Sequence, residues 1–252
     1  MKGMIPLLRK EIKEQLVTYR FLIVSAVFLL FGIAMPLLQK YSAQLLSGST
    51  EGASITLPPP SAAAALMDYI SSIAQFGLLV VVLMAMGAIA NEIKHGTAIV
   101  SLTKPVSRTA FVTSKLAALS MTFVVSLGIG STICFAYSTW LIGPVSLSPF
   151  IGLNLLFALF LVFCLALTLL FSSLFRSSLV AGGLAMGSII VSQTALNSIP
   201  VAGKFTPGRL LEWGINLLNA QDATYWGAVI FTAVAVVACV VGARTILCRR
   251  EV

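Results

Sequence analysis

Charged side chains are scarce in this sequence. Its 252 residues include 16 Lys and Arg and 8 Asp and Glu, about 10% in all, whereas 58% of the residues are hydrophobic. Soluble globular domains carry roughly 25% charged residues, so a water-soluble surface cannot be built from this composition. The few charges lie in short clusters that are separated by long uncharged runs. Such runs predict membrane-spanning segments.

Histidine is almost absent, because His95 is the only one. The centres of the predicted spans also contain no carboxylate. A Ser-His dyad, an Asp pair and an HExxH zinc site are therefore excluded within the membrane. The sequence contains no GxxxxGK[ST] motif, so it has no P-loop for ATP. We expect no enzyme, no catalytic residue and no cofactor held by this chain.

The cysteines and the basic residues exclude two further classes of protein. No CxxC spacing occurs, and three of the four cysteines lie within apolar runs, so we expect neither a disulfide nor a metal site. The formal net charge is +8, yet the basic residues form no stripe with interleaved aromatics. Nucleic-acid binding is therefore not expected, and membrane topology explains the basic residues better.

The first 20 residues combine charge with a helical apolar pattern. We predict an amphipathic helix over 1–20 that lies on the membrane surface, with a charged flank before the first span as the alternative. The apolar positions at helical spacing are Leu7, Leu8, Ile12 and Leu16, and the charged positions among them include Arg9, Lys10, Glu11 and Lys13.

Six apolar segments follow, and they predict an all-α, polytopic membrane protein with a single transmembrane domain over 1–252. A turn-rich loop with three consecutive prolines is expected over 39–60, and Ser61 is expected to cap the next helix. A loop is expected over 91–111, and a short re-entrant or interfacial helix over 199–224. The predicted spans are 21–38, 69–90, 112–142, 150–171, 179–198 and 225–243.

The distribution of Lys and Arg predicts the orientation. Thirteen of them fall on the side of the two termini, and only Lys40, Lys204 and Arg209 fall on the other. Because cytoplasmic segments carry the excess of Lys and Arg, both termini and the 91–111 loop are expected in the cytoplasm.

Polar residues within the spans are few. Gln193 and Asn197 are the most polar, and hydroxyls such as Ser131 and Thr168 are expected to bond neighbouring helices. The span at 179–198 is rich in Gly and Ala, which suits either tight packing within one chain or an interface between subunits.

Short motifs around the 91–111 loop resemble the ABC-2-type permeases, the membrane subunits of one class of ABC transporters. The six-span plan and the outer segment before the last span are similar as well. The matching residues are Arg9-Lys10-Glu11, then Glu92 followed by Gly96-Thr97, and Lys104-Pro105-Val106-Ser107-Arg108 followed by Lys115.

The resemblance implies roles for these residues. The start of the chain would be the family's elbow helix, with Arg9, Lys10 and Glu11. The 91–111 loop would hold the coupling helix that docks on an ATPase subunit. The residues implied for that contact are Glu92, Lys94, Gly96, Thr97, Lys104, Pro105 and Arg108.

The resemblance also implies partners and a mechanism. We expect two ATPase subunits that carry ATP and Mg, a second and identical permease subunit, and surrounding membrane lipid. Gln193 and Asn197 are candidates to line the translocation path. Because the spans lack charges, that path favours an amphipathic or hydrophobic substrate, or a peptide, over a bare ion. We expect the protein in the plasma membrane of a bacterium or archaeon. A non-transporting anchor and a scramblase-like subunit that works without ATP are the alternatives.

Overall fold

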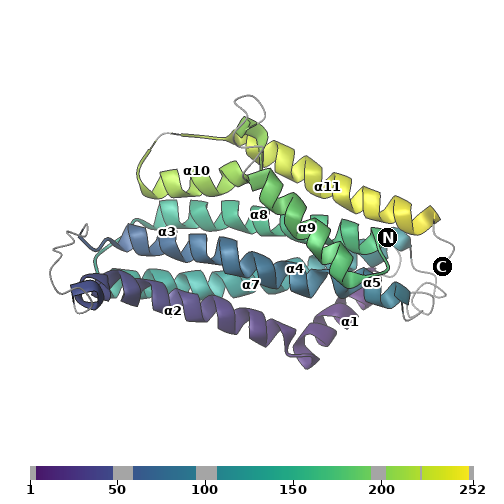
Figure 1. The fold of residues 1–252 in the computed structure, drawn as a ribbon, viewed down its shortest axis with the longest axis horizontal. Coiled ribbons are helices and arrows are strands. Elements are labelled where there is room, and N and C mark those ends of the chain that lie inside the picture. Colours follow the sequence, from purple (N-terminus) through teal and green to yellow (C-terminus); the bar gives the residue numbers. More distant parts are fainter. Residues whose placement is uncertain (1–3, 48–58, 95–106, 194–202, 222, 250–252) are drawn as a thin grey trace.

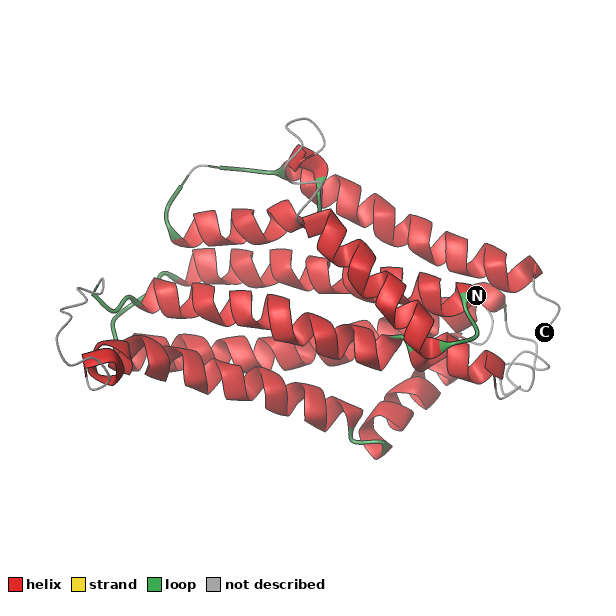
Figure 2. Cartoon of the chain, in the orientation of Figure 1, coloured by secondary structure: helices red, strands yellow, loops and turns green. Residues whose placement is uncertain are grey.

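The chain forms an elongated bundle of helices in a computed structural model that describes residues 4–47, 59–94, 107–193, 203–221 and 223–249. Figure 1 shows the long helices running side by side along the longest axis, and Figure 2 shows helices and loops without strands in the described part. The helices are α1 (Met4–Val17), α2 (Arg20–Ser47), α3 (Ala62–Ser72), α4 (Leu78–Ala85), α5 (Gly87–Lys94), α7 (Arg108–Leu141), α8 (Leu147–Leu174), α9 (Ser178–Gln193), α10 (Gly208–Leu218) and α11 (Trp226–Arg249), with a π-helical turn η1 (Ile73–Gly77) and a 3₁₀ turn η3 (Gly203–Phe205).

Five helical stretches are long and apolar enough to cross a membrane, given the roughly 20 residues that a span requires. The prediction of an all-helical protein with several apolar membrane segments is therefore confirmed. The fifth predicted span, 179–198, corresponds to α9, which has 16 described residues and is shorter than these five stretches. The five stretches are Arg20–Ser42, Ala62–Lys94, Arg108–Leu141, Leu147–Leu174 and Trp226–Arg249.

Local sequence signals set several helix ends. The Ser61 side chain accepts a hydrogen bond from the backbone N–H of Ala64, which confirms the predicted cap. Ser107 caps α7 in the same way, by accepting from the N–H of Ala110. Between α1 and α2 the chain turns at Tyr19, whose φ of 57° lies in the left-handed region.

Helix α2 continues beyond its predicted end. The sequence analysis places a loop over 39–60, but α2 runs on to Ser47, so the first part of that prediction is wrong. Pro36 lies inside the helix without ending it. The polar residues after it, such as Gln39 and Lys40, are compatible with helix because exposed helical turns tolerate them.

Helix α7 lies at the centre of the packing and contacts α1, α2, α3, α8 and α11. Its closest crossing is with α2, where a methyl group on Gly32 would come within 2.5 Å of the carbonyl oxygen of Gly130. A methyl group on Gly130 would in turn meet the Tyr69 hydroxyl at 2.5 Å and the Phe28 carbonyl oxygen at 2.7 Å. Glycine at both positions lets the two backbones approach, as is common between helices in lipid.

Most hydroxyls within the helices bond their own helix. Ser131 donates to the carbonyl of Gly128, and Thr168 donates to that of Cys164 at 2.7 Å. The expectation that these two bond neighbouring helices is therefore wrong, because a helical Ser or Thr reaches the carbonyl three or four residues back more easily. An interhelical pair does form between Ser25 and Ser126, whose oxygens are 2.8 Å apart.

The segment before α11 contains the amphipathic helix α10, which packs against α8. Arg209 pairs with Glu212 and lies 5.5 Å from the ring centre of Tyr225. The rings of Trp213 and Trp226 meet edge-on at 5.2 Å. This aromatic and charged cluster holds α10 beside the first turn of α11.

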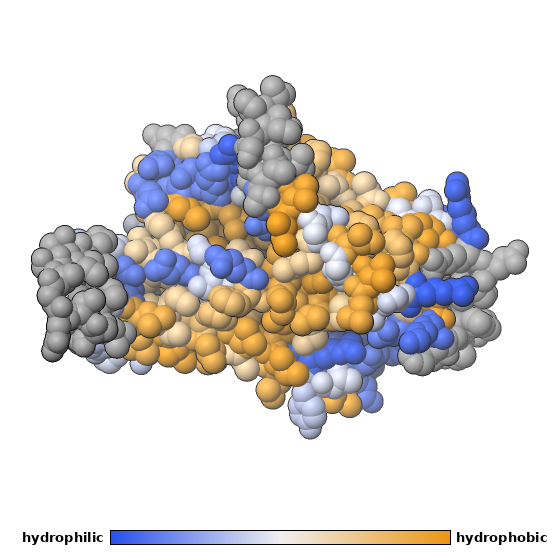
Figure 3. All heavy atoms as spheres, in the orientation of Figure 1, coloured by the Kyte–Doolittle hydropathy of each residue, from blue (hydrophilic) through white to orange (hydrophobic). Residues whose placement is uncertain are grey.

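The surface is apolar around the middle of the bundle. On the face in Figure 3, hydrophobic residues cover most of the central region and hydrophilic residues gather towards the two ends. Exposed large side chains on several helices contribute to this band, among them Leu30, Leu79, Val125, Leu184 and Val237. Such a band is the surface that a bilayer covers.

Candidate functional site

The polar face of α1 is buried against α7. Glu11 and Gln15, one helical turn apart, are the buried residues of α1. The Thr122 hydroxyl of α7 donates a hydrogen bond to the side-chain carbonyl oxygen of Gln15. Helix α1 therefore turns its carboxylate and amide inwards, and it leaves apolar residues such as Ile5 and Val17 exposed.

A buried lysine joins three helices in this region. The Lys115 ammonium group on α7 lies 2.9 Å from Oε1 of Glu11 on α1 and 2.7 Å from Oε1 of Glu92 on α5. The Lys115 side chain is only 3% exposed, and those of Glu11 and Glu92 are 12% and 17% exposed. Hydrogen bonds between such charged groups are among the strongest in proteins. We call these three residues the Lys115 network.

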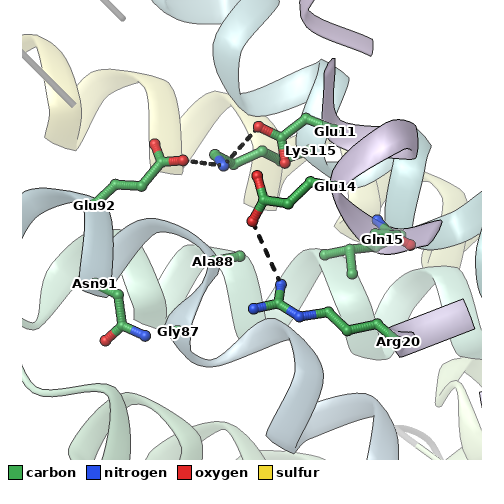
Figure 4. Close-up of a pocket in the computed structure, with 10 residues that line it drawn as sticks. Glu11, Glu14, Gln15, Arg20, Gly87, Ala88, Asn91, Glu92 and Lys115 are labelled. Atoms are coloured by element: carbon green, nitrogen blue, oxygen red, sulfur yellow. Dashed lines mark hydrogen bonds and ion pairs between the residues drawn. The ribbon is translucent and has the colours of Figure 1, made fainter. Parts of the chain in front are cut away.

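Further charged side chains surround the network, and some of them line a small pocket that Figure 4 shows. Lys10 lies 3.9 Å from Glu11 and 4.0 Å from Glu92, and its side chain is half exposed. On the other side of the pocket, Arg20 lies 4.0 Å from Glu14. The pocket has a volume of about 100 Å3 and is lined by residues of α1, α5 and α7 and by Arg20 at the start of α2. Carboxylates and cations thus alternate where the three helices meet.

The Ala62–Lys94 stretch is interrupted at Met86, between α4 and α5, and we call this interruption the kink. The Ser172 hydroxyl of α8 donates to the Met86 carbonyl at 2.7 Å and accepts from the N–H groups of Ile89 and Ala90 at 3.2 and 3.0 Å. A side chain that inserts into the helical hydrogen-bond ladder is a recognised cause of a kink. Because Ser172 is fully buried, these bonds hold α5 in place, and with it Glu92.

The neighbouring residues leave little room at the kink. A methyl group on Gly182 of α9 would come within 2.7 Å of the Met86 sulfur, so α9 packs closely on this point. The same stretch also contains the π-helical turn η1 (Ile73–Gly77). π-helical turns and kinks are frequent at functional sites, where they allow a helix to bend.

Arg108, at the start of α7, makes a contact within the chain. Its guanidinium group donates a hydrogen bond to the Leu247 carbonyl near the end of α11. The last carbonyls of a helix lack partners within the helix, and a cation there is favourable. Arg108 thereby ties the end of α11 to the site, so this bond competes with its implied contact to a partner.

The structure brings together only some of the predicted site residues. Lys10, Glu11 and Glu92 meet around Lys115, whereas Arg9 and Lys94 are exposed. Gln193 lies at the end of α9, remote in sequence from the network, and its amide nitrogen is buried without a hydrogen-bond partner among the described residues. The predicted residues Gly96, Thr97, Lys104, Pro105 and Asn197 lie outside the described residues.

Three important residues were not singled out as site residues by the sequence analysis: Lys115, Gln15 and Ser172. Lys115 and Gln15 do carry a signal, since each is a polar residue one helical turn from apolar neighbours. Ser172 carries none, because a serine in an apolar run has many ordinary roles. The role of Ser172 follows only from the tertiary structure, in which it forms hydrogen bonds with Met86, Ile89 and Ala90.

The arrangement consists of ion pairs and hydrogen bonds between buried side chains of different helices. The described residues contain no group of three His, Cys, Asp or Glu that could hold a metal ion. The cysteines are free, with Cys134, Cys164 and Cys239 buried and Cys248 exposed. What the site provides is a buried, charge-paired joint between α1, α5 and α7, next to the segment that connects α5 with α7.

Comparison with known proteins gives two findings. The family model of the ABC-2 family transporter proteins matches residues 5–243. The chain is also 24% identical, over 231 residues and 90% of each chain, to the uncharacterized transmembrane protein YxlG of Bacillus subtilis (strain 168). The family match covers every described helix except the first residue of α1 and the last six residues of α11. With its apolar spans and the Lys115 network between its helices, this multi-pass membrane protein belongs to the ABC-2 family of transporter proteins.

Proposed function

We propose that this chain is the permease subunit of an ABC transporter and moves an amphipathic or hydrophobic substrate with energy from a separate ATPase subunit. Membership of the ABC-2 family supports the membrane component. The absence of a P-loop from the sequence requires ATP and Mg to be bound by the partner. Two ATPase copies and a second, identical permease subunit complete the proposed assembly.

The observation that carries this proposal is the Lys115 network. It joins α1, α5 and α7 at the end of the bundle where the 95–106 segment leaves α5 and returns to Ser107. A force on that segment acts on Glu92 through only a few residues of α5. Because Lys115 binds Glu92 and Glu11 together, displacement of α5 also moves α1 and α7. Buried ion pairs of this kind favour discrete arrangements over gradual deformation.

The Ser172 kink supplies the point about which α5 moves. Its three hydrogen bonds hold one angle between α4 and α5, and their exchange for other partners permits a second angle. ATP binding to the partner would favour one of the two packings, which is a population shift driven by differential binding.

The topology that we propose has six spans, with α9 and the residues after it as the fifth, and α1 as an elbow helix on the cytoplasmic surface. Both termini lie in the cytoplasm of a bacterium or archaeon. The excess of Lys and Arg at the end that holds α1, α5 and the end of α11 supports this orientation.

The apolar character of the spans supports the substrate class. The charged residues in the candidate spans lie near the helix ends, as Asp68, Glu92 and Lys115 do, and the centres are uncharged. A path between two such subunits, with Gln193, Asn197 and a few hydroxyls along it, suits a lipid-like molecule or a peptide better than a bare ion. An ATPase rate that responds to sodium and to no amphiphile would contradict this class.

Co-purification tests the proposal directly. The tagged chain is isolated in detergent and bound proteins are identified by mass spectrometry. We compare wild type with Lys94→Glu/Lys104→Glu, which reverses charge next to the α5–α7 connection, and with Lys40→Glu/Lys204→Glu as a control of equal charge change on the other side. A P-loop ATPase that binds wild type and the control, but is lost from the first variant, supports the transporter. No ATPase in any sample favours the anchor or scramblase-like alternative.

A further inference from the structure

A groove lies between the exposed side of α1 and the outward face of α7. It has a volume of about 230 Å3, and its accessible lining is almost entirely apolar. Ile12, Leu16 and Phe21 line one side of it, and Ala118, Met121 and Val125 of α7 line the other. At its buried floor the Thr122 hydroxyl donates a hydrogen bond to the side-chain oxygen of Gln15, so these two polar side chains are paired with each other.

The rim of the groove is exposed despite its apolar chemistry. Leu16 is 54% exposed and Met121 is 56% exposed. Met121 and Val125 belong to a candidate span, so the groove opens from the membrane-facing side of α7. Contact of such surface with water is unfavourable, whereas a hydrocarbon chain would cover it without that penalty.

Two cations lie beside the groove on the next face of α1. Arg9 and Lys13 are one turn apart, and they stand three residues before Ile12 and Leu16, which places each cation next to an apolar lining residue. Both cations border a shallow depression together with Ile5. In the part of the chain that the structure describes, neither Arg9 nor Lys13 forms an ion pair with a carboxylate, whereas Lys10 is within 4.0 Å of two.

We propose that this surface binds an anionic phospholipid of the adjacent leaflet, with an acyl chain in the groove and the headgroup phosphate at Arg9 and Lys13. The charge of the headgroup complements the two cations, and the acyl chain complements the apolar groove that adjoins them. A zwitterionic lipid fills the groove equally well but contributes no net negative charge. The site therefore distinguishes lipids by headgroup charge.

The position of the site gives the bound lipid a structural consequence. Helix α1 lies between the lipid on one face and the Lys115 network on the other. A lipid in the groove contacts both α1 and α7 and so favours the position of α1 in which Glu11 binds Lys115 and Gln15 binds Thr122. Anionic lipid is thus expected to stabilise the docked position of α1, whether or not an ATPase is present.

The test uses the purified full-length chain alone, so its outcome is independent of the proposed ATPase partner. The protein is equilibrated with equal amounts of phosphatidylglycerol and phosphatidylcholine that have identical acyl chains, and retained lipids are counted by native mass spectrometry. We compare wild type with Arg9→Gln/Lys13→Gln. The matched control is Arg244→Gln/Arg249→Gln, which removes two exposed charges from the end of α11.

We expect wild type and the control to prefer phosphatidylglycerol. We expect Arg9→Gln/Lys13→Gln to reduce that preference about five-fold for each charge removed, equivalent to about 1 kcal/mol per basic residue. Met121→Trp, which fills the groove from an exposed position, should reduce retention of both lipids. Inorganic phosphate at millimolar concentration should not displace the lipid, because it lacks the acyl chain.

Several results overturn the proposal. Equal retention of the two lipids by wild type, or an unchanged preference in the Arg9→Gln/Lys13→Gln variant, would show that Arg9 and Lys13 do not select an anionic headgroup. Full retention of lipid by Met121→Trp, or displacement of the lipid by phosphate alone, would show that the acyl chain does not bind in the groove.

Discussion

Lys115 on α7 and Glu92 on α5 meet at 2.7 Å inside the protein, where the lysine side chain is 3% exposed. The contact joins the helix before the 95–106 segment to the helix after it. Since Lys115 also binds Glu11 at 2.9 Å, the same ammonium group fixes the position of α1. One buried cation thereby couples three helices of an ABC-2 family protein.

Removal of the Lys115 charge should destabilise the protein strongly. In Lys115→Met, Glu11 and Glu92 lose their buried common partner and keep only the more distant, half-exposed Lys10. Loss of one member of a buried ion pair costs about 3–5 kcal/mol. Thermal unfolding in detergent measures the change. Exposed Lys94→Met is the control and should have little effect. Addition of Glu11→Gln and Glu92→Gln to Lys115→Met should recover part of the loss, and no recovery would contradict an electrostatic cause.

Removal of the Ser172 hydroxyl should loosen the kink at Met86. Ser172→Ala leaves the N–H groups of Ile89 and Ala90 without this acceptor, and an unsatisfied buried group costs about 1–3 kcal/mol. Hydrogen exchange should rise at these two amides before the rest of α5. Ser173→Ala is a matched control, because Ser173 is equally buried but donates only to Leu170 of its own helix. Equal effects of the two changes would argue against a special role for Ser172.

The crossing of α2 and α7 should not tolerate a side chain at Gly130. A methyl group there lies 2.7 Å from the Phe28 backbone oxygen, so Gly130→Ala must push the helices apart, at a cost of about 1–3 kcal/mol for overpacking. Gly128→Ala, two residues away, meets nothing within 4 Å and should be neutral or slightly stabilising. The thermal midpoints of the two variants give the comparison. Similar midpoints would show that the helices are not in close contact there.

Loss of the Arg108 guanidinium should release the end of α11. Arg108→Gln removes the charged donor to the Leu247 carbonyl, and hydrogen bonds to charged groups contribute about 1.5–3 kcal/mol. We expect faster proteolysis and faster hydrogen exchange in the last turn of α11. Arg249→Gln, an exposed change in that turn, is the control. Unchanged protection in Arg108→Gln would show that the contact contributes little.

The sequence alone predicts much of the helical architecture because the relevant signals are local. Uncharged runs of about 20 residues indicate spans, and Ser61 indicates the start of a helix. The end of α2 was mispredicted for a related reason: polar residues and a nearby proline resemble a loop, although an exposed helix accepts them. The motifs singled out Glu11 as part of the elbow helix and Glu92 as a contact for an ATPase, but they did not predict that both bind Lys115.

The composition and apolar pattern of the sequence by themselves determined that this is an all-helical membrane protein, since a bilayer admits such segments only with their backbone bonds satisfied within helices. Only the tertiary structure decided that Lys115 lies between Glu11 and Glu92, because Glu11 and Lys115 are 104 residues apart and no local pattern relates them. The kink about Ser172 likewise depends on a serine that reaches Met86 from 86 residues away. Helix formation depends on residues that are near in sequence, whereas the pairing of buried charges depends on which helix faces meet.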